Sequence, residues 1–211
     1  MQRRTLVALA TLAATLSAPA FSQSGEIRIA HVYSKTGPLE AYGKQTQTGL
    51  MMGLDYATGG TMAVNGKKIV VIERDDQGKP DLGKSLLASA YSDDKADIAV
   101  GPTSSGVALA LLPVAEEYKK ILLVEPAVAD AITGDKWNKY IFRTGRNSSQ
   151  DAISNAVAID KAGVTIATLA QDYAFGRDGV KAFKVPSKMP SWRTRNTCPP
   201  APPTSPLAPS A

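Results

Sequence analysis

The sequence predicts an α/β fold in which helices cover both faces of a parallel β-sheet. Two observations predict it. Strand and helix patterns alternate along residues 26–184, which is typical of parallel strands joined by crossover helices. The segments "DIAV" and "ILLV" are apolar without alternation, as expected of strands that are buried on both faces. With 211 residues, 44% of them hydrophobic, the chain is long enough to bury a core.

Runs of β-branched and apolar residues predict the strands. The first run, "EIRIAHVY", is followed by a turn-rich segment, residues 34–44, in which Gly37 and Pro38 indicate a loop. An Asn65-Gly66 pair before the second strand is typical of a tight hairpin turn. The predicted strands cover residues 26–33, 67–76, 96–102, 120–127, 139–145 and 164–172.

Apolar residues at helical spacing predict the helices between these strands. The first helix ends at Gly59-Gly60, a typical C-terminal signal. The alternating pattern stops at Lys184, one helix into a second series of strands and helices. The predicted helices cover residues 45–58, 81–93, 106–119, 149–162 and 175–184.

The N-terminal residues 1–22 are predicted to be a secretory signal peptide. "MQRR" supplies a positive end, "TLVALATLAATL" an apolar run, and "SAPAFSQ" small residues for cleavage near Ala20 or Ser22. A buried first helix is the alternative, but the three features come in the order of a signal peptide. We therefore expect an exported protein.

The net charge of +5 belongs to the two ends of the chain. Residues 1–22 carry +2 and residues 185–211 carry +3, which leaves residues 23–184 neutral. Binding of nucleic acid needs basic residues clustered on the folded part, so the composition does not support it. The single cysteine, Cys198, lies in the C-terminal tail, so no disulfide or thiolate nucleophile is expected in the body.

The last segment, residues 185–211, differs in composition from the rest. It holds eight of the 14 prolines and no acidic residue. Proline at this density cannot continue the preceding helix, and it predicts a disordered, extended tail. Such a tail is either a plain solvated end, a linker, or a ligand for a recognition domain.

The residues that could carry chemistry do not indicate an enzyme. His31 is the only histidine, and it lies inside the first predicted strand, where a packed strand residue is the favoured interpretation. The carboxylates Asp75, Asp76, Asp93 and Asp94 have no histidine or cysteine beside them and are interpreted as solvated loop residues. No phosphate-binding loop follows a strand. We expect no catalysis, no cofactor and no metal.

Polar loops follow three of the predicted strands, at residues 34–43, 101–106 and 125–130. Ligands of open α/β sheets bind at the carboxyl ends of the strands. Ser104 and Ser105 begin a helix, where hydroxyls and unpaired N–H groups suit a carboxylate. The alternative is that these serines only cap their own helix.

Five segments in order resemble one family. They are "IRIAHVYSKTGPLEAYGKQTQTGLMMGLDY", "VVIERDDQGKP", "IAVGPTSSGVALALLPVAEEYKKILLVEPAVAD", "YIFRTGRNSSQDA" and "LAQDYAFGRDGV". The chain resembles the periplasmic substrate-binding proteins of branched-chain-amino-acid-type ABC importers, which are similar to the leucine/isoleucine/valine-binding proteins. The resemblance implies a type I periplasmic-binding-protein-like fold, with one lobe at residues 23–145 and the start of a second, incomplete lobe at residues 146–184.

The resemblance also implies site residues. The serine-rich segment would hold a carboxylate, and the segment around Ala129 would meet an amino group. Many amino-acid binders have threonine at the place of Ala129, so an aromatic acid or an amide is an alternative ligand. The residues that match the family's ligand-binding positions are Tyr42, Thr103, Ser104, Ser105, Ala127, Ala129, Tyr173 and Phe175.

The function that the resemblance implies is capture of a small carboxylate-bearing solute, such as a branched-chain or other amino acid. The partner would be an ABC permease of the inner membrane, and the protein a periplasmic monomer that uses no cofactor. A ligand-sensing receptor domain is the alternative. When the codons of the tail are regrouped in another reading frame, they can encode the Tyr-x-Pro…Thr-Asp-Phe pattern that the family carries after the helix at residues 175–184. We therefore expect a frameshift near Val185 and a truncated second lobe.

Overall fold

The computed structural model describes residues 25–159, 161, 166–184 and 193–194. The predicted signal peptide lies outside the described residues, and so does the predicted tail, except for one short strand. That strand, β8, is Arg193–Thr194 and pairs in parallel with β7.

A mixed, mostly parallel sheet of six strands forms the centre of the fold. Its order is β2-β3-β1-β4-β5-β6, with only β2 antiparallel to its neighbour. The Asn65-Gly66 pair turns β2 into β3, which confirms the predicted hairpin. The strands are β1 (Glu26–Tyr33), β2 (Ala63–Val64), β3 (Lys67–Asp75), β4 (Ile98–Val100), β5 (Ile121–Val124) and β6 (Ile141–Arg143).

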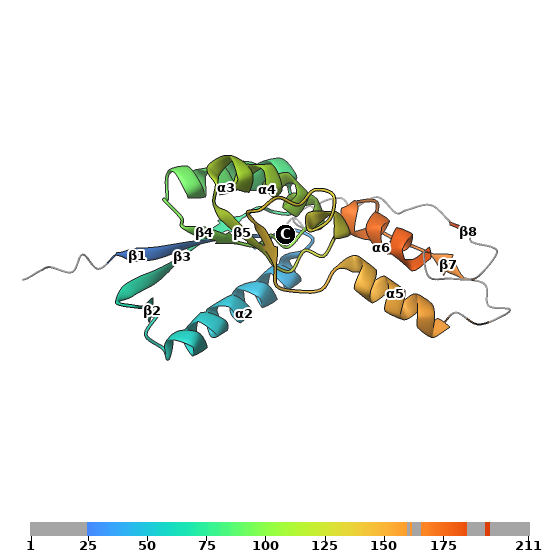
Figure 1. The fold of residues 1–211 in the computed structure, drawn as a ribbon, viewed down its shortest axis with the longest axis horizontal. Coiled ribbons are helices and arrows are strands. Elements are labelled where there is room, and N and C mark those ends of the chain that lie inside the picture. Colours follow the sequence, from blue (N-terminus) through green and yellow to red (C-terminus); the bar gives the residue numbers. More distant parts are fainter. Residues whose placement is uncertain (1–24, 160, 162–165, 185–192, 195–211) are drawn as a thin grey trace, which may run out of the picture.

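Helices cover both faces of this sheet, as the sequence predicts. Figure 1 shows α3 and α4 on one face and α2 on the other. Two further helices, α5 and α6, lie with β7 beyond the carboxyl ends of the strands and start a second unit. The helices are α2 (Glu40–Thr58), α3 (Pro80–Ser92), α4 (Ser105–Tyr118), the 3-10 turn η1 (Asp130–Ile132), α5 (Ser148–Ile159) and α6 (Ala174–Lys184), and β7 is Ala167–Thr168.

The core is divided by the alternation of side chains along β1. Ala30 and Val32 belong to the larger cluster, which includes Leu87 of α3 and Leu111 of α4. Ile29 packs on the opposite face in a small cluster to which α2 contributes partly buried side chains. Successive side chains of a strand point to opposite faces, so the central strand supplies both layers.

Predicted boundaries differ from the observed ones at several elements, and two differences stand out. Residues 34–44 were expected to be a loop, but α2 already begins at Glu40. The helix can begin early because Gly43 has no side chain, since a Cβ atom there would lie 2.1 Å from the carbonyl oxygen of Ser34. The strand predicted over 164–172 is reduced to Ala167–Thr168 among the described residues.

His31 is an uncharged residue inside the sheet. Its side chain is fully buried and stacks on Tyr33, with ring centroids 4.1 Å apart. Neither ring nitrogen has a hydrogen-bond partner in the described part of the chain. Burial lowers the pKa of His31 to about 4, although the nearby charge of Glu73 opposes the shift.

We expect His31 to make the fold sensitive to acid. The unfolded chain binds a proton at this histidine near pH 6.5, whereas the folded chain binds it only near pH 4. Stability is therefore lost as the pH falls between these values, by about 3 kcal/mol from this residue. Urea unfolding from pH 7 to pH 4 should show a smaller loss for His31→Leu than for the wild type. His31→Gln, which is polar but does not titrate, is the control, and parallel curves for all three proteins would contradict the expectation.

Gly101 lies where the chain leaves β4 and passes against β1. Its φ of +118° is in the region that favours glycine, and a Cβ atom there would lie 1.9 Å from the carbonyl oxygen of Val32. No side-chain rotation can relieve a clash with backbone. Only glycine therefore fits at this strand end.

Replacing Gly101 by alanine should destabilise the fold by more than about 3 kcal/mol, because both strain and overlap must be relieved. Gly53, which lies inside α2 with no atom within 4 Å of an added Cβ, is the matched control. Gly53→Ala should stabilise the chain by about 0.5–1 kcal/mol. Denaturant unfolding measures both, and equal effects of the two substitutions would show that the contact with Val32 is not limiting.

Candidate functional site

A cleft of ≈ 400 Å³ lies at the carboxyl ends of β1, β3 and β4. Loops from these three strands form its walls, and the start of the second unit contributes to it as well. In open α/β sheets this edge is where ligands bind. The lining residues are Pro38, Leu39, Gln77, Gly78, Lys79, Pro80, Ser104, Gly106, Gln171 and Tyr173.

Three hydroxyl residues in a row mark the point where β4 gives way to α4, and two of them hold neighbouring loops. Thr103 Oγ1 accepts a hydrogen bond from the backbone N–H of Ser34, at 3.1 Å. Ser105 Oγ accepts from the N–H groups of Val128 and Ala129, at 3.3 and 3.2 Å. Both side chains are therefore committed to backbone that follows other strands.

Ser104 differs from its two neighbours. It is the N-cap residue of α4, but its side chain makes no capping hydrogen bond. Ser104 lines the cleft, and no hydrogen bond to its hydroxyl is found among the described residues. The alternative that these serines cap their own helix therefore does not apply, because Ser105 bonds elsewhere and Ser104 leaves its oxygen available.

Asp76 corrects one interpretation of the sequence. It was expected to be a solvated loop carboxylate, but it is fully buried behind the cleft. Its Oδ1 accepts from Ser34 Oγ and from the N–H of Gly78, both at 2.7 Å, while Oδ2 has no partner in the described chain. Burial raises the pKa of this carboxyl group, and the two hydrogen bonds oppose the shift.

Ala127 and Ala129 are buried and do not line the cleft. The segment between them is held by Arg143, at the end of β6. The guanidinium group of Arg143 donates to the carbonyl of Ala129 at 2.7 Å, to that of Ala127 at 3.5 Å and to Thr133 Oγ1 at 3.0 Å. Both backbone groups of Ala129 are thus already bonded, because Ser105 binds its N–H.

The second unit reaches the cleft through Tyr173. This side chain lies near Gly106 of α4, where an added Cβ atom would be 3.8 Å from the tyrosine ring. Burial raises the pKa of Tyr173. Phe175 is close to it, with ring centroids 6.0 Å apart, but lines a separate cavity of ≈ 650 Å³ between α5, β7 and α6.

Contacts of Asp130 join the second unit to the sheet. Its carboxylate accepts the N–H of Ser149 at the start of α5, at 3.0 Å. Its own N–H donates to the carboxylate of Asp178 in α6, also at 3.0 Å. One residue of η1 is therefore bonded to both helices of the second unit.

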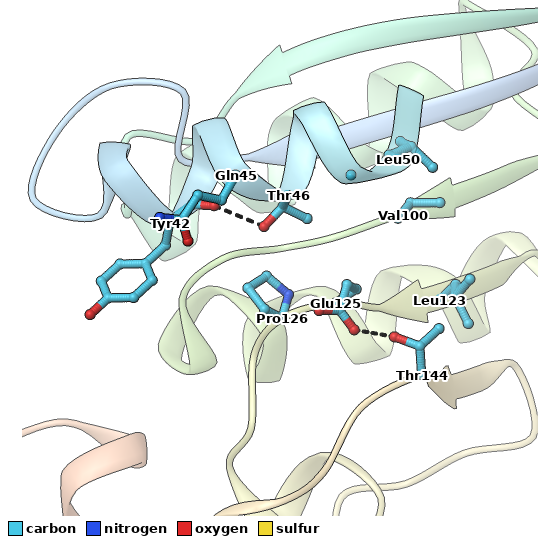
Figure 2. A pocket seen from close by; sticks show the side chains of 10 residues that line it. Tyr42, Gln45, Thr46, Leu50, Val100, Leu123, Glu125, Pro126 and Thr144 are labelled. Atoms are coloured by element: carbon cyan, nitrogen blue, oxygen red, sulfur yellow. Dashed lines mark hydrogen bonds between the residues drawn. The ribbon is translucent and has the colours of Figure 1, made fainter. Parts of the chain in front are cut away.

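Tyr42 lies in a different cavity, of ≈ 490 Å³, between α2 and the ends of β4 and β5. Figure 2 shows its ring turned away from Leu50, Val100 and Leu123, which form the apolar end of that cavity. On the opposite wall, Thr144 donates a hydrogen bond to Glu125. The structure thus brings Ser104 and Tyr173 together and leaves Tyr42 and Phe175 outside the cleft.

The cleft also includes Pro38, Gln171 and residues 77–80. They were not predicted as cleft residues, although their segments were recognised. Their position after a strand was the available signal.

Among the described residues, no three His, Cys, Asp or Glu side chains are grouped so as to hold a metal ion. In the same part of the chain, no helix has the length and apolar character needed to cross a membrane.

The chain belongs to the periplasmic binding protein family, whose model matches residues 26–186. Its fold is the type I periplasmic binding protein fold, as similar solved structures show. This confirms the resemblance and the fold class that the sequence predicts.

Three similar proteins place the chain more closely. It is 30% identical over 185 residues to the Leu/Ile/Val-binding protein BraC3 of Rhizobium johnstonii. This match covers 83% of this chain and 48% of BraC3. An ABC-type branched-chain amino acid transporter of Rhodopseudomonas palustris CGA009 is 70% identical, with a TM-score of 0.68, over 82% of this chain and 47% of its own. A solute-binding protein of R. palustris in complex with benzoate is 26% identical, with a TM-score of 0.74, over 84% and 49%. The chain thus spans about half the length of these relatives.

The different tasks of Ser104 and Ser105 predict different effects on stability. Ser105→Ala should lower the free energy of unfolding by about 1–3 kcal/mol, because the buried N–H of Ala129 and the half-buried N–H of Val128 lose their acceptor. Ser104→Ala should change it by less than about 0.5 kcal/mol, because this side chain makes no hydrogen bond. Chemical denaturation of the two variants tests the pair, and a larger loss for Ser104→Ala would contradict the assignment.

Proposed function

We propose that residues 23–184 form the first lobe, and the start of the second lobe, of an extracytoplasmic solute-binding protein. The protein captures a small carboxylate-bearing solute and delivers it to an ABC permease of the inner membrane. It binds the solute without converting it. The family and the relatives of known name support this function, and residues 1–22 would serve as its export signal.

The observation that carries the proposal is the position of the cleft at the N-terminus of α4. The first turn of a helix has N–H groups without intrahelical acceptors and carries the positive end of the helix dipole. Ser104 adds a hydroxyl without a hydrogen bond at the same place. Together these groups suit a carboxylate, and Tyr173 supplies an aromatic surface beside it.

Within this class of solute, the charges that line the cleft favour a carboxylate without an α-amino group. The lining residues include no Asp or Glu, and they include Lys79. The positive charge of Lys79 repels an ammonium group and attracts a carboxylate. The benzoate complex of a similar protein supports an aromatic acid as the ligand.

Titration of the ¹⁵N-labelled chain with benzoate, 4-hydroxybenzoate, isoleucine and leucine tests the function and the class of solute. We expect benzoate to bind weakly, with a Kd on the order of 1 mM. Of the described cleft residues, the second unit supplies two, Gln171 and Tyr173, so it buries little of the solute. Amide resonances of residues 103–106 should shift. Isoleucine should bind at least about tenfold more weakly, because no carboxylate of the cleft pairs with its ammonium group and Lys79 repels it.

Ser104→Ala should weaken benzoate binding by about three- to tenfold through loss of one hydrogen bond to a charged group. Ser85→Ala, an exposed serine of α3, is the control and should bind like the wild type. Tighter binding of isoleucine would overturn the aromatic acid while keeping solute capture. Absence of binding of all four compounds would overturn solute capture by this chain.

A further inference from the structure

Two walls of the cleft are joined by one buried carboxyl group. We infer that Asp76 is a positioning residue for solute binding, which sets the place of the 77–80 loop and of Ser104 at the same time. The inference rests on the proposed function, because it concerns how the same cleft is held in shape. It assigns a role in binding to a residue that touches no cleft surface itself.

The first wall is the loop that follows Asp76. Oδ1 of Asp76 accepts from the N–H of Gly78 at 2.7 Å, and the carbonyl oxygen of Asp76 accepts from the N–H of Lys79 at 2.8 Å. The loop is thereby folded back over the residue that precedes it. Residues 77–80 of this loop all line the cleft.

The second wall is reached through Ser34. Its hydroxyl donates to Asp76 Oδ1 at 2.7 Å, and its backbone N–H donates to Thr103 Oγ1 at 3.1 Å. Thr103 directly precedes Ser104, the cleft residue at the start of α4. A chain of two hydrogen bonds therefore connects the end of β3 with the loop after β4, through the end of β1.

Burial makes this connection firm. Asp76 and Ser34 are fully buried and Thr103 is 7% exposed, so water does not compete for these bonds. Oδ2 of Asp76 has no partner among the described residues, and so both donors depend on the single atom Oδ1. Binding groups that are held by buried hydrogen bonds are preorganised, and loss of the support costs affinity.

Three variants of the full 211-residue chain separate positioning from stability. Asp76→Asn keeps an acceptor at the place of Oδ1, and Asp76→Leu removes it. Leu122→Ala opens the core at β5, away from the cleft, and controls for lost stability. Two quantities are measured: the affinity for benzoate and isoleucine as probes, and the ¹H–¹⁵N amide resonances of Gly78 and Ser104 without any probe.

We expect Asp76→Leu to weaken binding of the preferred probe by about tenfold or more. Asp76→Asn should recover most of this loss, and Leu122→Ala should bind within about threefold of the wild type, because the loss of stability is not at the cleft. Without a probe, the amide resonances of Gly78 and Ser104 should shift in Asp76→Leu and stay close to the wild type in the other two. Should Asp76→Leu not fold, Ser34→Ala takes its place and should move the Ser104 resonance.

Unchanged binding in Asp76→Leu would overturn the inference, and so would equal weakening by Asp76→Leu and Leu122→Ala. Should the wild type bind neither probe, the proposed function fails, and the amide resonances alone decide. Resonances of Gly78 and Ser104 that stay in place in Asp76→Leu, or in Ser34→Ala if that variant is used, then overturn the positioning role.

Discussion

The parallel register of β1 with its two neighbours determines where the groups that β1, β3 and β4 bring to the cleft lie. His31 of β1 is level with Glu73 of β3 and with Val100 of β4. Because all three strands run the same way, their loops leave the sheet at one edge. Ser34 meets Asp76 and Thr103 there. Asp76 is 42 positions and Thr103 is 69 positions from Ser34 in the sequence. The sheet thus converts distant sequence segments into one continuous surface.

The sequence is sufficient to predict most of the framework. Alternation of strand and helix, apolar runs and the Asn65-Gly66 turn indicate the parallel sheet, the helices on its two faces and the hairpin, because these signals are local. The early start of α2 at Glu40 could not be predicted, because it depends on Gly43 lying against Ser34, a contact between backbone segments. Among the described residues β7 is shorter than predicted, since its ladder with β8 spans two residues, and an apolar run does not show how long the partner strand is.

The sequence indicates the edge of the sheet at which the candidate cleft lies, but not the contacts of its residues. Serines after a strand indicate an anion site, yet the tasks of Thr103 and Ser105 depend on which loop lies opposite each hydroxyl. Asp76 carries no sequence signal that separates it from Asp75, whose carboxylate accepts from Thr36 and from the N–H of Gln77 nearer the surface. Arg143 was overlooked because its partners are carbonyl oxygens, which every residue has. Burial and backbone partners are properties of the fold and cannot be read from residue type.

Among the described residues the Ser104 hydroxyl makes no hydrogen bond, and this separates two kinds of change during evolution. Its neighbours on either side tie loops together, so a substitution at Thr103 or Ser105 changes the fold itself. Among the described residues, the Ser104 side chain holds no loop and makes no capping hydrogen bond. A lineage can therefore exchange this one residue, and with it the surface chemistry of the cleft, without a second mutation to restore the scaffold. In such a protein, the surface of the cleft can change at single positions while the architecture stays fixed.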